Sequence, residues 1–151
     1  MRLEDEIKQK KFKNEYQKAI INIYFTNCFI TSKFQDILKE YKITSQQYNI
    51  LRILRGQYPQ SATMGEIKER MLDRSSDITR MIDRLVSKKL VERRGSRKDR
   101  RLVEAKITLY GLNMLEEMDA CEQRMDELIS HLSEGEVKML NKLLDKVRLN
   151  G

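Results

Sequence analysis

The chain reads VERRGSRKDRRLVEAKITLYG from Val91 to Gly111, and this stretch decides the fold. Apolar and polar residues alternate on both sides of a polar tip that contains Gly95, which is the pattern of two β-strands joined in a hairpin. Burying the tip would cost too much free energy, because its cations would lose their hydration without gaining partners. The sequence therefore predicts an exposed, charged hairpin that can meet a polyanion. Its cations are Arg93, Arg94, Arg97, Lys98, Arg100 and Arg101.

An amphipathic helix is expected directly before the hairpin, over about residues 75–88. A shorter helix precedes it and opens with Thr63 and Glu66 in a capping-box pattern. Short helix, tight turn and second helix form a helix-turn-helix, and the basic hairpin that follows makes it a winged helix-turn-helix, a module that reads double-stranded DNA. The apolar stripe of the second helix recurs at intervals of three and four: Ile78, Met81, Ile82 and Leu85.

The two ends of the chain predict helices with more apolar surface than one small core can cover. The first forty residues contain neither glycine nor proline, and apolar residues spaced by three and four over 12–41 predict one long helix. The same spacing returns over residues 109–132, and a last helix opens with Ser133 and Glu136 in another capping box. We therefore expect these helical arms to hold a stable homodimer.

Together these patterns predict a mainly α fold with a small β-hairpin wing, in which a winged helix-turn-helix is flanked by long dimerising helices. Residues 1–42 are expected to form an N-terminal dimerisation helix and residues 43–108 the DNA-binding module, whose first helix opens with Thr44 and Gln47 in a capping box. Residues 109–151 are expected to form the C-terminal dimerisation helices. The three parts should make one intertwined structural domain.

Composition agrees with an anionic partner. The chain has 151 residues, a net charge of +7 and a pI near 9.4, and a basic protein attracts nucleic acid. No stretch approaches the roughly 18 apolar residues that cross a bilayer. The N-terminus lacks a signal core, so we expect a cytoplasmic protein without membrane contact, in which Cys28 and Cys121 are reduced thiols.

The polar face of the helix at 75–88 is expected to read DNA, because the N-terminal half of a recognition helix reaches base edges. Arg80 can pair with both acceptors of a guanine, whereas Asp83 would be repelled by phosphate and is expected to orient an arginine. The predicted contacts from this helix are Ser75, Ser76, Thr79, Arg80 and Arg84. The predicted contacts from the hairpin tip are Arg97, Lys98, Arg100 and Arg101.

Enzyme function has little support in the sequence. One histidine, no glycine-rich phosphate loop, no serine elbow and no metal-ligand cluster predict no catalysis, no cofactor and no metal. A winged helix can also bind proteins or RNA. Duplex DNA is favoured because duplex RNA hides its major groove from side chains.

The chain resembles the multiple-antibiotic-resistance regulator (MarR) family in two motifs. One is TRMIDRL at residues 79–85, followed by LVER at residues 90–93. The other is DRR at residues 99–101, followed by Ile107-Thr108 and then Gly111. Two positions depart from the family pattern. Lys89 stands where glycine is usual, which would cost about 1 kcal/mol or somewhat more if the backbone there is left-handed, and Ala105 replaces a branched residue in the second wing strand.

The resemblance implies a homodimer with intertwined terminal helices that binds a pseudo-palindromic operator, with the recognition helices in successive major grooves. It implies repression that a small ligand or oxidation relieves. In the wing it implies that Asp99 braces the loop and that Arg101 enters the minor groove, where narrow A·T-rich segments attract arginine.

Two further hypotheses concern regulation. Family members that sense peroxide through a cysteine on the first helix make Cys28 the candidate for a thiol-based redox switch, although a mid-helix thiol is more commonly a small buried apolar side chain. An effector pocket is expected where the terminal helices approach the DNA module. Its candidate lining residues, which are equally good core residues, are Tyr24, Phe25, Phe29, Tyr48 and Tyr110.

Overall fold

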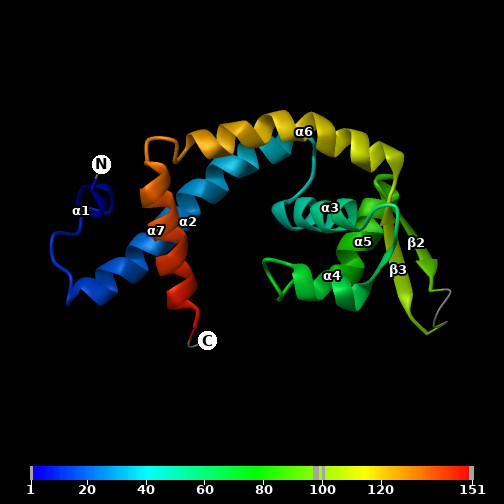
Figure 1. Ribbon diagram of the computed structural model, residues 1–151, viewed down its shortest axis with the longest axis horizontal. Coiled ribbons are helices and arrows are strands. Elements are labelled where there is room, and N and C mark those ends of the chain that lie inside the picture. The colour runs from blue at the N-terminus through cyan, green and yellow to red at the C-terminus, as the bar shows by residue number, and fades with distance from the viewer. Residues whose placement is uncertain (1, 97–98, 100, 150–151) are drawn as a thin grey trace.

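The computed structural model describes residues 2–96, 99 and 101–149, apart from the side chains of residues 121 and 122. A long helical arm leads away from a small module, as Figure 1 shows. In chain order the elements are α1 (Leu3–Glu6), α2 (Glu15–Glu40), α3 (Ser45–Gln57), β1 (Ala62–Thr63), α4 (Met64–Arg70), α5 (Ile78–Ser87), β2 (Val91–Gly95), β3 (Val103–Ile107), α6 (Leu109–Glu127) and α7 (Glu134–Val147). The mainly α fold class predicted from the sequence is confirmed.

The module contains α3, α4, α5 and a three-stranded antiparallel sheet in the order β1-β3-β2. The predicted hairpin is β2 and β3, in which Arg94 faces Glu104 and Arg93 faces Ala105. The strand β1, in which Ala62 pairs with Ala105, was not predicted from the sequence. Ala105 therefore lies on the middle strand, between Ala62 of β1 and Arg93 of β2, and it is completely buried.

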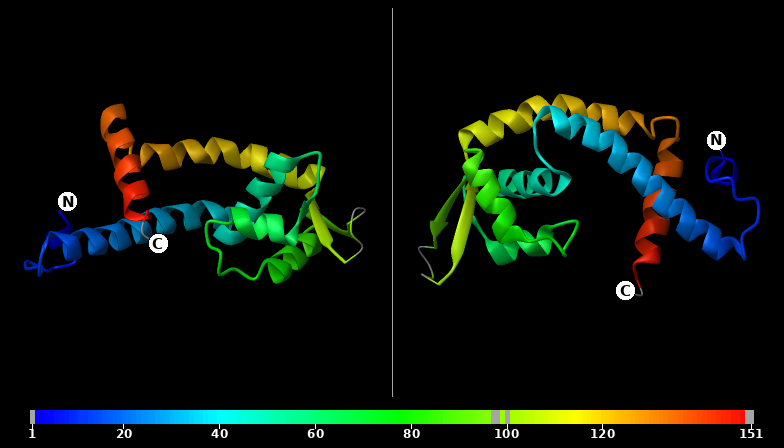
Figure 2. Two further views of the ribbon diagram at one scale, coloured as in Figure 1. Left: turned by 60° about the horizontal axis from the view of Figure 1, so that its bottom comes forward. Right: turned by 180° about the vertical axis from the view of Figure 1, so that it is seen from behind.

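One apolar core holds the module together and joins it to the arm. The stripe predicted for the recognition helix faces the core: Ile78, Ile82 and Leu85 are buried, and Met81 is partly buried against them. The core continues through α6, where Leu115 and Met118 pack against residues of α3 such as Leu51. α6 leaves the wing and runs antiparallel to α2 along the arm, as Figures 1 and 2 show. The direction of the arm is thus set by the core of the module.

Three helix starts predicted from capping boxes are confirmed. In each, the hydroxyl of the N-cap residue accepts from a backbone N–H three residues later, and the side chain of that later residue accepts from the N-cap backbone. The pairs are Thr44 with Gln47, Thr63 with Glu66, and Ser133 with Glu136. A local exchange of this kind fixes a helix boundary without tertiary contacts.

Two helix boundaries were predicted wrongly. The first forty residues do not form one helix: α1 is separate, and α2 begins only after Asn14, whose side chain accepts from the backbone N–H of Gln17 at 2.9 Å. α6 ends at Glu127 instead of Leu132. In both places the apolar spacing extends beyond the helix, to Phe12 before α2 and to Leu132 after α6, and both of these side chains are partly buried.

The backbone at the end of α5 is left-handed at Lys89, the position where the MarR family pattern has glycine. Lys89 has a φ of 61°. The Leu90 N–H donates to the Leu85 carbonyl at 3.0 Å, and the Lys89 N–H donates to the Val86 carbonyl at 2.9 Å. These two bonds form a Schellman motif, in which glycine is usual. A lysine here costs about 1 kcal/mol of stability relative to glycine, and the motif still forms.

Candidate nucleic-acid interface

The outward face of α5 presents polar side chains over a buried apolar stripe. Ile78 and Ile82 are buried against the core, whereas Thr79 and Arg80 on the other side are exposed, as is Arg84 one turn later. Within the described part of the chain, the Arg80 side chain takes part in no hydrogen bond or ion pair. Its guanidinium is therefore available to an external acceptor.

The turn before α5 places Ser75 and Ser76 outside the recognition helix, so the predicted start at Ser75 is wrong. Asp77 is the N-cap and accepts from the backbone N–H of Arg80 at 3.2 Å. Asp73 accepts from both the hydroxyl and the backbone N–H of Ser75, at 2.6 and 3.0 Å. These hydrogen bonds, with the Ser75 hydroxyl first, lower the pKa of the Asp73 carboxyl. The Ser75 hydroxyl is thus already engaged, and the Ser76 hydroxyl is buried.

An ion pair joins the recognition helix to the wing. Asp83, on the exposed face of α5, accepts a hydrogen bond from the guanidinium of Arg93 on β2. Both side chains are partly exposed. The carboxylate predicted to orient an arginine therefore contacts one, and it ties the angle of the wing to that of the helix.

The described part of the wing tip is closed by local hydrogen bonds. The Asp99 carboxylate accepts from the backbone N–H of Arg101 at 3.0 Å, and the Arg101 Nε lies 3.4 Å from the same oxygen. The Arg101 side chain is 91% exposed. Ser96 is buried and donates its backbone N–H to the carbonyl of Leu102 at 2.8 Å. The predicted contacts Arg97, Lys98 and Arg100 lie outside the described residues.

A second cluster, near the tip end of the two wing strands, was not predicted. Glu104 on β3 accepts from the Ser61 hydroxyl at 2.6 Å, and its carboxylate lies 3.7 Å from the Nε of Arg94. Sequence alone gave no signal for the part that Ser61 plays, because Ser61 lies in the loop before the unpredicted strand β1. The one available hint was a carboxylate at a register position opposite an arginine.

The junction between the wing and α6 requires Gly111. The Thr108 hydroxyl donates to the Lys89 carbonyl at 2.8 Å and accepts from the Gly111 N–H at 3.0 Å. A Cβ added to Gly111 would lie 2.5 Å from the Leu90 carbonyl oxygen. The threonine and the glycine of the second motif thus dock the first turn of α6 on the end of the recognition helix.

Positive charge is concentrated in the module. Residues 43–108 contain 16 of the 30 Lys and Arg residues and 8 of the 23 Asp and Glu residues, a net charge of +8. Residues 109–151 contain 5 basic and 9 acidic residues and are negatively charged. The charge that favours a polyanion therefore lies on the module and not on the C-terminal arm.

A hollow of about 450 Å³ lies where α2, α3 and α6 meet the turn before the recognition helix. Of the predicted lining residues, only Tyr48 borders it. Tyr24, Phe25 and Phe29 are exposed on α2, and Tyr110 is 62% exposed at the start of α6, so these four form neither the lining nor the core of the single chain. The lining residues are Ile30, Thr31, Phe34, Ser45, Tyr48, Asn49, Arg52, Leu72 and Met125.

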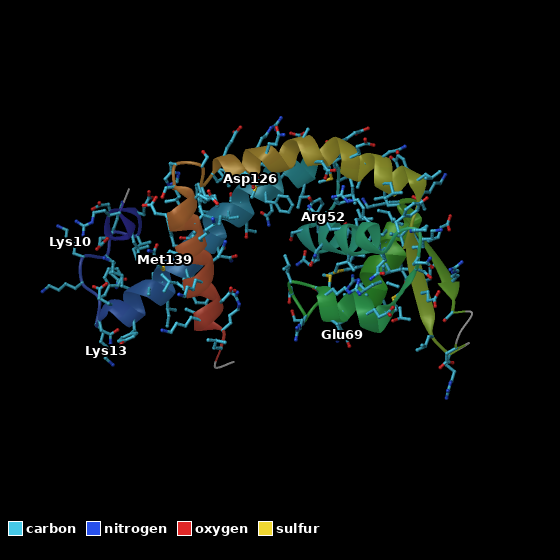
Figure 3. All side chains as sticks on the ribbon, viewed as in Figure 1. Lys10, Lys13, Arg52, Glu69, Asp126 and Met139 are labelled. Atoms are coloured by element: carbon cyan, nitrogen blue, oxygen red, sulfur yellow. The ribbon has the colours of Figure 1, made fainter. Side chains whose placement is uncertain are left out.

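The hollow combines aromatic walls with a cation. Phe34 and Tyr48 meet edge to face with ring centroids 5.0 Å apart. The guanidinium of Arg52, which is labelled on α3 in Figure 3, donates to the Tyr48 hydroxyl at 3.0 Å. Burial raises the pKa of the Tyr48 phenol, so this group stays protonated at neutral pH. Such walls fit a small aromatic anion.

Neither the described cysteine nor any cluster of possible metal ligands forms a second candidate site in the described part of the chain. Cys28 is exposed on α2, so the expectation of a buried thiol is wrong for the single chain, while the side chain of Cys121 lies outside the described part. Among the described residues, no three His, Cys, Asp or Glu side chains gather closely enough to hold a metal ion. In the same part of the chain, every helix is too short or too polar to cross a membrane.

Known proteins share this arrangement. A family model, MarR, matches residues 43–103. The HTH-type transcriptional regulator MhqR of Bacillus subtilis is 33% identical over 118 residues, which are 75% of this chain and 77% of that protein. The comparisons do not favour the redox alternative for Cys28.

Solved structures agree. A cysteine-to-serine mutant of MarR from E. coli, complexed with operator DNA, superposes with a TM-score of 0.78 at 31% identity, over 92% of this chain and 99% of that one. A MarR transcription factor from Planctomyces limnophilus gives a TM-score of 0.69 at 30% identity, over 89% of this chain and 98% of that one. With the relative from Bacillus subtilis, these likenesses show that the chain belongs to the MarR family of transcriptional regulators.

Proposed function

We propose that this chain forms a homodimer that represses transcription by binding a pseudo-palindromic duplex operator. The α5 helix of each subunit enters a major groove with Thr79 and Arg80 at the base edges, and each wing follows the neighbouring minor groove with Arg101. The observation that carries the proposal is Arg80 on the exposed face of α5, whose side chain has no partner among the described residues and lies in a module of net charge +8. Likeness to the E. coli MarR bound to operator DNA supports the same docking.

The division of labour follows the predicted boundaries: residues 1–42 and 109–151 dimerise, and residues 43–108 bind DNA. Large apolar side chains remain exposed along the arm, which a second copy of the chain would cover. We assign the protein no catalytic activity, metal or cofactor. The exposed arm residues include Tyr16, Ile20, Ile23 and Tyr24 on α2, and Met139, Leu140, Leu143 and Val147 on α7.

The test is a titration of the purified protein with operator duplexes selected from random DNA. We expect two chains per duplex, a two-fold repeated half-site, and an affinity whose logarithm falls with log salt by about 0.9 per phosphate contacted. Light scattering without DNA should give twice the 18.0 kDa mass of the chain. A species of 18.0 kDa alone at micromolar concentration, or an affinity that does not respond to salt, would overturn the proposal.

The hollow beside the turn before α5 is the proposed effector site. Leu72 belongs to that turn, and its backbone N–H donates to the side-chain oxygen of Asn49 at 2.9 Å. A ligand held between Phe34, Tyr48 and Arg52 would press on this turn and shift the recognition helix. The ligand would release the operator if it bound more tightly to the shifted position of α5 than to the position that fits DNA.

We expect small aromatic carboxylates to weaken operator binding, and Arg52→Gln to lose this response while it keeps its operator affinity. Arg124→Gln removes the same charge from an exposed position on α6 outside the lining, and it should respond as the parent does. Fluorescence anisotropy with a panel of benzoates measures both effects. An unchanged response in the Arg52 variant would place the effector elsewhere.

A further inference from the structure

Near the tip end of its strands, the wing contains a largely buried carboxylate that the DNA contacts proposed above do not use. Glu104 lies on β3, the middle strand of the sheet, and its side chain is 13% exposed. It accepts from the Ser61 hydroxyl at 2.6 Å, and its carboxylate lies 3.7 Å from the Nε of Arg94. Arg94 also donates to the Ser61 hydroxyl at 3.1 Å, which closes a three-residue cluster.

Arg93 and Arg94, which are neighbours on β2, make contacts on opposite faces of the wing. Successive side chains of a strand point to opposite faces. Arg93 accordingly reaches Asp83 on the recognition helix, whereas Arg94 reaches Glu104 and Ser61. Ser61 directly precedes β1 and the helix α4, so β2 is fastened to both helices of the helix-turn-helix.

A carboxylate at this position is unfavourable if charge alone is considered. Any negative charge on a DNA-binding module repels phosphate, and its removal should strengthen binding. A carboxylate that is mostly withdrawn from water also costs desolvation unless partners compensate. The described contacts of Glu104 with Ser61 and Arg94 contribute to that compensation, and they link β2 to β3 and to the residue before β1.

We propose that Glu104 is a positioning residue for DNA binding. Through Ser61 and Arg94 it holds the wing at the angle at which Arg101 and the recognition helix engage one operator together. This inference rests on the proposed function, since it concerns the same interface.

The experiment compares Glu104→Gln with Glu92→Gln. Glu92 lies on β2 of the same wing and is exposed, so its variant removes an equal charge without touching the cluster. Affinities are measured by fluorescence anisotropy on two operators that differ only in flanks that are A·T-rich or G·C-rich. Unfolding in urea at the same protein concentration reports the stability of each variant.

We expect Glu104→Gln to weaken binding to the A·T-flanked operator about fivefold, equivalent to about 1 kcal/mol, and to lose most of the preference for A·T flanks. Glu92→Gln should bind as tightly as the parent or more tightly, and it should keep that preference. Ser61→Ala changes no charge and should shift the preference in the same direction as Glu104→Gln, so it carries the test if the glutamine variant fails to fold.

Two results would overturn the inference. If Glu104→Gln strengthens binding as Glu92→Gln does, the carboxylate acts only by its charge. If Glu104→Gln weakens binding to both operators equally, the orientation of the wing has not changed and Glu104 does not position it. A parent protein that binds neither operator would instead refute the proposed function, so the two failures are distinguishable.

Discussion

Replacing Gly111 with alanine should lower the free energy of unfolding by about 1–3 kcal/mol, and by more if the helix cannot shift. The new Cβ would lie 2.5 Å from the Leu90 carbonyl oxygen and 2.7 Å from Cγ1 of Ile107. Ile107 is buried and β-branched, so its Cγ1 has little freedom to move. The Leu90 carbonyl cannot yield easily either. It accepts from the backbone N–H of Thr108 at 3.1 Å, and it belongs to the residue that completes the cap of α5. The Thr108 hydroxyl, which donates to the neighbouring Lys89 carbonyl, also lies 3.1 Å from the Leu90 carbonyl oxygen.

Urea unfolding followed by circular dichroism measures this loss, at one protein concentration because dimerisation would be linked to unfolding. Gly135→Ala is the matched control. Gly135 is in the first turn of α7, where an added Cβ meets nothing within 4 Å. Removing a helical glycine there should leave stability unchanged or raise it by up to about 1 kcal/mol. Equal stability of the two variants would show that α6 does not dock through this contact.

The sequence predicted those parts of the fold whose signals are local. Capping boxes at Thr44, Thr63 and Ser133 located three helix starts because both partners of each exchange lie within four residues. Alternation predicted β2 and β3. The two-residue strand β1 is too short to alternate, and it exists only because β3 is there to pair with it.

Competition between neighbouring capping residues explains the misplaced start of the recognition helix. Ser75, Ser76 and Asp77 are all good N-cap residues, so sequence alone could not choose among them. Asp73 decides the outcome, because it binds the hydroxyl and backbone N–H of Ser75 in a turn and leaves Asp77 to cap the helix. The predicted helix contacts that remain on α5 are Thr79, Arg80 and Arg84.

The hollow could not be predicted from residue types. Tyr24, Phe25 and Phe29 are expected to line a pocket where the terminal helices approach the module, but on α2 they are exposed and lie outside the lining of the hollow. Tyr48 was placed correctly, yet Arg52, one turn further along α3, was missed. Which face of a long helix meets a neighbour depends on tertiary packing, and α2 has apolar residues on more than one face.

Arg80→Ala should weaken operator binding by about 1–3 kcal/mol and relax the preference at one symmetric pair of positions, as the loss of a bidentate contact to a base does. The physical reason is the orientation of α5: burial of Ile82 and Leu85 turns Arg80 outward, on the first turn of the helix. A guanidinium there can reach a purine edge once the helix lies in the groove. Selection from random DNA, with parent and variant in parallel, measures both the loss and its position.

Arg101→Ala should give a different pattern. The Arg101 side chain is almost fully exposed on the wing, and its Nε lies 3.4 Å from the Asp99 carboxylate. An arginine in the minor groove senses groove width, which is narrow in A·T-rich DNA, and it does not read one base pair. Its loss should therefore weaken binding most on A·T-rich flanks and leave the core half-site preference intact. If both variants lose affinity uniformly across all sequences, Arg80 contacts phosphate alone, and specificity must come from other residues of α5.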